Sequence, residues 1–225
     1  MLPESGFDTL TFDCYGTLID WQGGIGEAFR VEAGKQGRSV DIGAILKAHA
    51  EIEPQEQAGP YRSYRDVLRQ TAWKIGARIG LTIPPDRIRF LEDHLQSWSP
   101  FPDTNTALER LRKKYHLGIL SNIDDDLLAA TLKHFSVTFD WTVTAEQVRS
   151  YKPATAHFEK AIERAGGKDK ILHVAASRFH DVGPAKQLGI PVIWVNRKGE
   201  TPDDSGPKPD HVVSNLLELA DTLVA

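Results

Sequence analysis

The run Leu10-Thr11-Phe12-Asp13-Cys14-Tyr15-Gly16-Thr17-Leu18 decides how this chain is interpreted. Its apolar start predicts a buried strand over Thr9 to Phe12 that ends at Asp13, directly before a Gly-containing turn. A carboxylate at the carboxyl edge of a strand, beside the free amides of such a loop, is placed to attack an electrophile while the amides bind an anion. The alternative is structural, because an Asp before a turn often only hydrogen-bonds the loop's own amides.

The composition is that of an ordinary globular protein. The 225 residues, 40% hydrophobic and 26% charged, suffice for one substantial core or for a core domain plus a smaller insert. A net charge of -4, with no basic cluster longer than Arg112-Lys113-Lys114, argues against nucleic acid or an anionic membrane as the partner. Met1 to Gly6 lacks a signal-peptide pattern, and no apolar run is long enough to span a bilayer. The single cysteine, Cys14, fits a reducing cytoplasm and is expected as a small buried side chain rather than an activated thiol.

Beyond about residue 100, apolar runs of strand length alternate with amphipathic stretches, which predicts βα units and a parallel sheet. Together with Thr9 to Phe12, the expected strands are His116 to Leu120, Trp141 to Thr144, Ile171 to Ala175, Pro191 to Val195 and His211 to Val213. The helices expected between them are Thr104 to Lys114, Asp125 to Phe135, Ala154 to Ala165 and Gly183 to Leu188. The fold class is therefore expected to be α/β, with a Rossmann-like parallel sheet of about six strands.

The stretch from about residue 22 to 98 shows helical periodicity and no convincing strand. An all-helical block inserted after the first strand is most simply a cap over the carboxyl edge of that strand. The two prolines of Trp98-Ser99-Pro100-Phe101-Pro102-Asp103 indicate the return linker, because proline resists continuing a helix. We therefore expect an α/β core domain of residues 1–20 and 99–225 and a helical cap domain of residues 21–98.

Ligands of open parallel sheets bind beyond the carboxyl ends of the strands, and polar residues follow three further segments there. Ser121-Asn122 comes after a buried run, where the two side chains either cap the next helix or donate hydrogen bonds to a substrate anion. Lys152 precedes a helix start, where a cation is unfavourable unless an anion compensates for it, although a solvated surface lysine is the ordinary interpretation. Asp181 follows the strand of residues 171–175 and equally suits a helix cap.

The order Asp, Ser-Asn, Lys-Pro, His-Asp resembles the haloacid dehalogenase superfamily over essentially the whole chain. The four motif positions are Asp13, Ser121, Lys152 and Asp181. Phosphatases of that superfamily carry a second Asp two residues after the nucleophile, where this chain has Tyr15. The run Phe12 to Leu18 instead resembles the type II (S)-2-haloacid dehalogenase branch. The runs Thr11 to Trp21, Ser-Asn-Ile-Asp and Ser-Tyr-Lys-Pro are also similar to the azetidine-2-carboxylate hydrolases in that branch, which open a strained C–N ring.

The resemblance implies a hydrolase that acts through an aspartyl ester. Asp13, braced by Thr17, would displace a leaving group from the carbon alpha to a carboxylate, and water near Asp181 and Lys152 would then cleave the ester. Lys152 would keep Asp13 ionised, as a nearby opposite charge does. The amides of Cys14 and Tyr15 with Ser121 would hold the substrate carboxylate, and Asn122 would face the leaving group. The residues expected to bind substrate are Cys14, Tyr15, Ser121, Asn122, Lys47 and Ser177.

Two departures distinguish this chain from the dehalogenases that it resembles. By the spacing around Ile42 to Ala48, Lys47 is the closest match to the arginine that receives halide, and lysine lacks the planar fork of arginine. Ala176 and Arg178 stand where dehalogenases carry a Ser and an Asn. Because Ala176 also occupies the likeliest position of a magnesium ligand, only Asp181 remains for an ion that prefers six oxygens. We therefore expect neither a metal nor another cofactor.

The sequence thus predicts a cytoplasmic hydrolase for a small 2-substituted carboxylic acid, with hydrolytic dehalogenation of (S)-2-haloacids as the leading reaction. The alternatives are hydrolysis of another alpha leaving group, such as the C–N bond of azetidine-2-carboxylate, and a phosphatase, which Tyr15 disfavours. A binding protein on the same scaffold is the alternative from another class, and the joint presence of Asp13, Lys152 and Asp181 speaks against it. The physiological substrate, the chirality preference and the oligomeric state, a homodimer included, stay open.

Overall fold

The computed structural model describes residues 6–201 and 206–224, which form a single six-stranded sheet. All neighbouring strands pair in parallel, in the order β3-β2-β1-β4-β5-β6. The strands are β1 (Thr9–Phe12), β2 (His116–Ser121), β3 (Trp141–Thr144), β4 (Ile171–Ala175), β5 (Val192–Val195) and β6 (His211–Val213). The predicted α/β class is therefore confirmed, and the expected strand boundaries lie within one residue of these. Residues 1–5, which carry most of the expectation that there is no signal peptide, lie outside the described residues.

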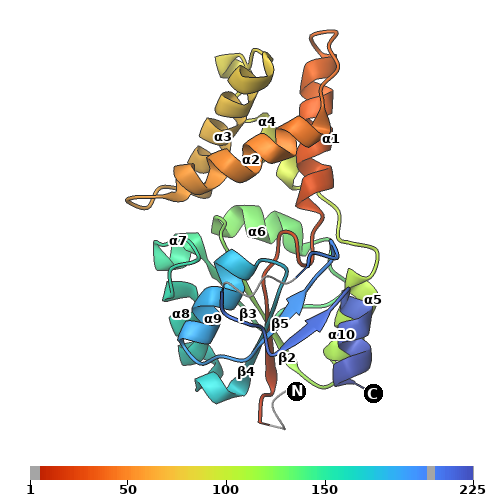
Figure 1. Ribbon diagram of the computed structural model, residues 1–225, viewed down its shortest axis with the longest axis vertical. Coiled ribbons are helices and arrows are strands. Elements are labelled where there is room, and N and C mark those ends of the chain that lie inside the picture. Colours follow the sequence, from red (N-terminus) through yellow and green to blue (C-terminus); the bar gives the residue numbers. More distant parts are fainter. Residues whose placement is uncertain (1–5, 202–205, 225) are drawn as a thin grey trace.

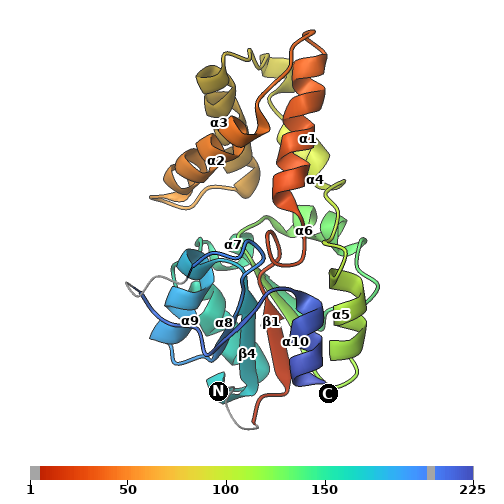
Figure 2. The same cartoon turned by 45° about the vertical axis from the view of Figure 1, so that its right-hand side comes forward.

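Helices cover both faces of the sheet (Figure 1). On one face α5 (Thr104–Leu111) lies beside α10 (Leu216–Leu223), and α7 (Ala145–Val148), α8 (Ala156–Ala165) and α9 (Gly183–Gln187) lie on the other side (Figures 1 and 2). Because both faces are covered, every residue of β1, β4 and β5 is buried, which explains their continuous apolar runs. None of the described helices is long and apolar enough to cross a membrane.

Four further helices lie beyond the carboxyl ends of the strands (Figures 1 and 2). They are α1 (Trp21–Gly34), α2 (Ile42–Gln57), α3 (Tyr64–Ile79) and α4 (Phe90–Leu95), and we refer to residues 21–98 as the helical segment. The Asp20 carboxylate accepts a hydrogen bond from the Gly23 amide and so begins α1, while Ser63 caps α3 in the same way through the Asp66 amide. Separate domains with boundaries at 20/21 and 98/99 stay a prediction.

α3 of the helical segment contacts α6 (Asp125–Leu132), a helix of the α/β part that follows β2. The buried Asp124 carboxylate, directly before α6, accepts hydrogen bonds from the Tyr64 and Arg65 amides at 2.8 and 3.0 Å. These amides belong to the first turn of α3, where the helix dipole favours a negative charge. The Arg65 guanidinium in turn donates to both oxygens of Asp126 at 2.7 Å. This contact holds α3 over the carboxyl edge of the sheet.

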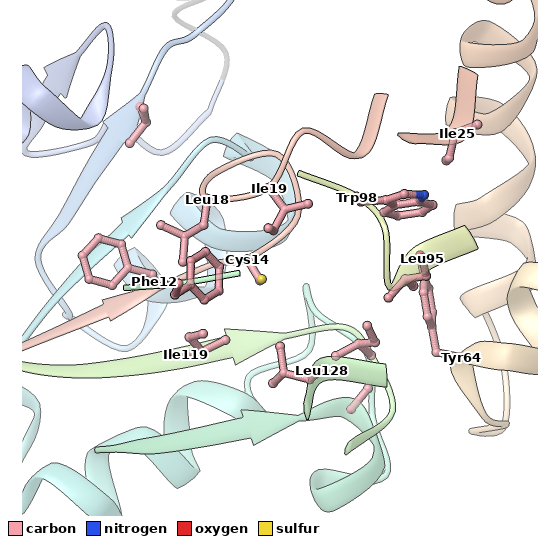
Figure 3. Close-up of a cluster of buried hydrophobic side chains, with 14 of the residues drawn as sticks. Phe12, Cys14, Leu18, Ile19, Ile25, Tyr64, Leu95, Trp98, Ile119 and Leu128 are labelled. Atoms are coloured by element: carbon pink, nitrogen blue, oxygen red, sulfur yellow. The ribbon is translucent and has the colours of Figure 1, made fainter. Parts of the chain in front are cut away.

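The turn after β1 is shaped by close packing against α1. Gly16 has a φ of 99°, and a Cβ there would lie 2.9 Å from the Trp21 indole nitrogen, so glycine is the residue that fits. From β1 a buried apolar cluster runs through Cys14 and Ile19 to Trp98 of the helical segment (Figure 3). The expectation that Cys14 is a buried side chain is confirmed.

Candidate active site

The four motif positions meet at the carboxyl edge of the sheet. Asp13 follows β1, Ser121 ends β2 and Asp181 follows β4, and these are adjacent strands. The Lys152 ammonium lies between the two carboxylates, 2.9 Å from Asp13 Oδ1 and 2.6 Å from Asp181 Oδ1. It also donates to the Leu120 carbonyl at 2.8 Å, and the residue is only 2% exposed. Lys152 is therefore a buried bridge between two carboxylates and not a solvated surface lysine.

Thr17 holds the second oxygen of Asp13. Its hydroxyl donates to Asp13 Oδ2 at 2.9 Å and accepts from the Ala176 amide at 2.9 Å. The Arg197 guanidinium donates to the Thr17 carbonyl from Nη2 at 2.8 Å and packs on the Phe101 ring, 3.9 Å from its centroid. Both oxygens of the Asp13 carboxylate thus have fixed donors, which orients the side chain. Sequence reasoning missed Arg197, because nothing in its local pattern indicates a contact with a loop 180 positions earlier.

His173 supports Asp181 from within β4. Its Nε2 lies 3.1 Å from Asp181 Oδ1 and its Nδ1 lies 2.8 Å from the Thr11 hydroxyl. Asp181 itself stands in a π-helical turn, Arg178–Val182. Sequence reasoning assigned no role to His173, although a histidine inside an apolar strand is a usable signal, since a buried ring needs polar partners.

Two buried oxygens face the site without a hydrogen-bond partner among the described residues. They are Asp181 Oδ2 and the Ser121 hydroxyl oxygen. Buried polar atoms are rarely left unpaired in native proteins, so these two are suited to bind water or a substrate group.

The two carboxylates share one ammonium, so their titrations are coupled. Burial raises the pKa of Asp13 above its ordinary value, because Lys152 lowers this pKa less than burial and the Asp181 charge raise it. Burial also opposes ionisation of Asp181, but Lys152 and His173 outweigh it and hold the pKa of Asp181 well below its usual range. Lys152 thus favours the ionised form of Asp13 without cancelling the effects of burial and Asp181, and that Lys152 keeps Asp13 ionised stays a prediction; of the two carboxylates, Asp13 is the one protonated first.

Asn122 and Ser177 are held by neighbouring backbone and side-chain groups. The Asn122 side chain accepts from the Lys152 amide at 2.7 Å and donates to the Lys152 carbonyl at 3.0 Å. Asn122 therefore clamps the backbone of Lys152, and a contact of its side chain with a leaving group stays a prediction. The Ser177 hydroxyl accepts from the His180 amide at 3.0 Å and caps the turn that carries Asp181.

Tyr15 lies where a phosphatase would carry its acidic residue. Its hydroxyl is 2.7 Å from the Thr131 hydroxyl, and burial raises the pKa of Tyr15 well above its usual value. The side chain is therefore neutral and a weak acid. Burial likewise raises the pKa of the Cys14 thiol, which fits an inert side chain rather than a nucleophile.

A cavity of about 650 Å³ lies between the carboxyl edge and the helical segment. It brings together most of the expected site residues: Asp13, Tyr15, Ser121, Asn122, Lys152, Ser177 and Asp181. The helical segment adds residues that sequence reasoning did not single out: Trp21, Gln22, Ile25, His49, Glu53, Tyr64 and Trp98. A cavity of this size, with the charged side chains of Asp13, Lys152 and Asp181 in its lining, is typical of a site for a small polar ligand.

Lys47 is not among the residues that the structure places around the cavity. It is exposed on α2, whereas the face that α2 turns to the cavity consists of His49, Ala50, Glu53, Pro54 and Gln57. Lys47 shares a side of α2 with Ala50 and Pro54, three and seven residues further on, but it lies nearer the amino end of the helix than any cavity-lining residue of α2. The expectation for Lys47 is corrected accordingly, because spacing along the chain does not determine which turns of a helix reach the cavity.

The described side chains do not fit a magnesium ion. The Lys152 ammonium already lies between Asp13 and Asp181, the two carboxylates that would hold the ion. The described residues contain no group of three or more His, Cys, Asp or Glu side chains arranged around a metal position. Mg²⁺ prefers six oxygen ligands, so no step below is derived through a metal.

A strand-end aspartate, paired through a buried lysine beneath a helix-covered cavity, is an arrangement that fits a hydrolase. Residues 7–189 match the family model of the haloacid dehalogenase-like hydrolases, and the chain belongs to this family. Among curated proteins, it is 30% identical over 223 residues to an (S)-2-haloacid dehalogenase of Pseudomonas putida, a match that covers 96% of each chain. It is 26% identical to haloacetate dehalogenase H-2 of a Moraxella species, over 92% of this chain and 93% of the relative.

The fold also matches that of solved dehalogenases. One is the L-2-haloacid dehalogenase from Xanthobacter autotrophicus with chloropropionic acid covalently bound. The TM-score is 0.82 at 22% identity, over 97% of this chain and 98% of the other. This likeness supports the fold, and the curated relatives place the chain with the type II (S)-2-haloacid dehalogenases of the family.

Proposed function

We propose that this protein hydrolyses a small 2-substituted carboxylic acid through a covalent ester on Asp13. The observation that supports this most directly is the buried Lys152 bridge, which orients Asp13 towards the cavity together with Thr17. A carboxylate held in place by two donors needs little reorganisation before it attacks. The leading reaction is hydrolytic dehalogenation of (S)-2-haloacids, because the curated relatives at 24–30% identity include several (S)-2-haloacid dehalogenases.

In the first half-reaction, an Asp13 oxygen bonds to the carbon alpha to the substrate carboxylate, and the bond from that carbon to the leaving group breaks with its electron pair. The buried Ser121 hydroxyl and the amides of Cys14 and Tyr15 hold the substrate carboxylate in this proposal. Esterification removes the charge of Asp13, so the Lys152 ammonium then pairs with Asp181 alone, at 2.6 Å.

In the second half-reaction, water attacks the Asp13 carbonyl carbon and releases the 2-hydroxy acid. Asp181 is suited to receive the proton of this water, because its Oδ2 is buried and has no partner among the described residues. Its lowered pKa keeps it ionised and able to accept a hydrogen bond from water. His173 and Lys152 hold its other oxygen in place.

A second candidate is the expulsion of a different alpha leaving group, such as the ring nitrogen of azetidine-2-carboxylate. The observation that favours it is the position of Lys47, which leaves the part of the cavity lining from the helical segment without a Lys or Arg to receive a halide. A phosphatase is the third alternative, disfavoured by Tyr15, whose raised pKa makes it a poor proton donor.

Heavy-oxygen labelling tests the covalent step. With enzyme in excess over (S)-2-chloropropionate in ¹⁸O-water, the label is expected in Asp13 after one turnover and in the hydroxy acid only in later cycles. Peptide mass spectrometry of Asp13 measures this. Label in the first-turnover product would mean that water attacks the substrate itself, and Asp13 would not be the nucleophile.

The proposed setting is the reducing cytoplasm, since the single cysteine is buried and no described helix suits a membrane. The proposed ligand is a small acid, and no basic surface of the kind that binds nucleic acid is expected at a net charge of -4.

A further inference from the structure

The lysine and arginine side chains around the cavity are confined to one side of it. They all belong to the α/β part of the chain: Lys152, Arg178, Arg197 and Lys198, which lie there together with the carboxylates of Asp13, Asp181 and Glu200. The helical segment, which the structure describes throughout, contributes Glu53 and His49 and neither a lysine nor an arginine to this lining. A ligand that spans the cavity therefore meets cations and carboxylates on the sheet side, and on the helix side a carboxylate without a lysine or arginine.

Glu53 is a fixed group in this wall. Its Oε1 accepts a hydrogen bond from the Tyr64 hydroxyl at 2.7 Å, and its side chain is only 17% exposed. Its Oε2 lies 3.8 Å from His49 Nδ1, one helical turn away on the same face of α2. A carboxylate that is held in place and mostly screened from water attracts a cation more strongly than an exposed one.

His49 lies beside Glu53 on the same face of α2 and also lines the cavity. It is 3% exposed, and its Nε2 is buried without a hydrogen-bond partner among the described residues. The nearby Glu53 carboxylate favours the ring proton on Nδ1, which leaves a lone pair on Nε2. In the tautomer with the proton on Nδ1, Nε2 adds an acceptor beside Glu53, and an acceptor suits an N–H group and not a halide.

Aromatic rings complete the helix side of the cavity. Trp21 packs against His49 with the rings tilted by 37° and 4.9 Å between their centroids, and Trp98 meets Tyr15 edge to face at 5.9 Å. Trp21, Trp98 and Tyr64 all line the cavity. The faces of such rings attract ammonium groups and repel anions. Carboxylate, imidazole lone pair and aromatic rings thus favour the same sign of charge.

We propose that Glu53, supported by His49, is the specificity-determining residue of the cavity and selects acids with a positively charged nitrogen on the alpha carbon. Such a 2-ammonio acid is a zwitterion, with its carboxylate towards the cations and amides of the sheet side and its ammonium towards Glu53. This inference rests on the substrate orientation of the proposed function. It deepens the second candidate of that function, a leaving group other than halide, by naming the class of alpha substituent that the helix side recognises.

Binding tests this without any turnover. The probes are L-2-aminobutyrate and (S)-2-hydroxybutyrate, which share a carbon skeleton and differ in the ammonium and hydroxyl groups. Isothermal titration calorimetry of the wild-type protein is expected to give a dissociation constant at least about tenfold lower for the amino acid. Glu53→Gln is expected to weaken amino-acid binding by about tenfold and to leave hydroxy-acid binding within about twofold.

Matched variants separate recognition from folding. Glu51→Gln, on an exposed part of α2 where Glu51 pairs with Arg78, is expected to change neither affinity. Glu53→Asp keeps the charge and is expected to retain the preference for the amino acid, so that a loss of folding in Glu53→Gln does not decide the outcome. His49→Phe keeps an aromatic ring against Trp21 and is expected to weaken amino-acid binding by a smaller factor than Glu53→Gln.

The proposal is overturned if the hydroxy acid binds as tightly as the amino acid, if neither binds, or if Glu53→Gln weakens both equally. The two proposals fail separately. Absence of label in Asp13 with any substrate would remove the ester mechanism while leaving the binding preference intact. Labelled Asp13 together with equal affinities would remove the role of Glu53 alone.

Discussion

Replacing Lys152 by methionine is expected to destabilise the protein far more than replacing Asp13 by asparagine. Methionine has a similar length and no charge, so Lys152→Met leaves two buried carboxylates, Asp13 and Asp181, without their shared cation. Asp13→Asn instead leaves one carboxylate with one ammonium. Because burial and Asp181 raise the pKa of Asp13, its ionised form opposes folding at neutral pH, and the variant is expected to be at least as stable as the wild type.

The magnitude follows from the burial of the three groups. Lys152 is 2% exposed and Asp181 is fully buried, and removing one partner of a buried pair typically costs about 3–5 kcal/mol. For a chain of this size, each kcal/mol shifts the melting temperature by about 2–4 °C. Lys152→Met is therefore expected to melt roughly 6–20 °C below the wild type at neutral pH.

Thermal unfolding followed by circular dichroism between about pH 8 and pH 5.5 measures the loss of stability in Lys152→Met and the direction in which this loss changes with pH. In Lys152→Met, Asp13 and Asp181 lose the cation that lowers both pKa values while their burial still raises them, so we expect the folded state to bind more protons. Its stability is then expected to rise as the pH falls, because stability falls with pH wherever the folded state binds more protons. Lys47→Met, at an exposed position outside the cavity lining, is the control and is expected to match the wild type.

The double variant keeps this prediction testable if Lys152→Met is too unstable to study. With Asp13→Asn already present, Lys152→Met leaves one buried carboxylate without a cation instead of two, and we expect it to lower the melting temperature less. Equal losses in the single variants Lys152→Met and Asp13→Asn, or a melting temperature of Lys152→Met that does not rise towards acid pH, would refute the shared-cation account.

Three further expectations follow from the site. Because the pKa of Asp13 is raised, the rate of the first half-reaction, measured by rapid-quench halide release, is expected to fall at a pH above the pKa of an ordinary Asp. Asp181→Asn should move this acid limb of the pH profile to lower pH. An unmoved limb would contradict the coupling of the two carboxylates. Burial lowers the pKa of His157 to about 3, so its contribution to stability is present above the unfolded pKa and is lost as the pH falls. His157→Gln should reduce the decrease of the melting temperature towards acid pH. An unchanged dependence of the melting temperature on pH would speak against a neutral His157. Chelator should leave turnover of the correct substrate unchanged, whereas a loss restored by magnesium would revive the phosphatase alternative.

Local pattern was sufficient for the sheet and for most of the residues at its edge. Buried parallel strands read as continuous apolar runs between turn residues, so β1 to β6 and the polar positions after them were predictable. The carboxyl ends of adjacent parallel strands converge, which brought Asp13, Ser121 and Asp181 together as expected. The family resemblance then added the order of the motif, which no single segment carries.

The ionic state of the site depends on contacts between distant residues. Asp13 and Lys152 are 139 positions apart and still 2.9 Å from one another, and His173 reaches Asp181 from a neighbouring element. A pKa depends on burial and on every charge nearby, so the opposite shifts of Asp13 and Asp181 were not predictable from the residue types.

The sequence by itself determined the α/β sheet, the position of Asp13 at a strand end and the positions of its partners along the chain, because these depend on local hydrophobic pattern and turn chemistry. Only the tertiary structure decided which side chains of the helical segment face Asp13. Periodicity predicts that α2 is a helix, but its placement over the carboxyl edge is set by its packing against α1 and α3. That placement leaves Lys47 exposed outside the cavity lining and puts His49 and Glu53 in it, which sets the charge on the helix side of the cavity.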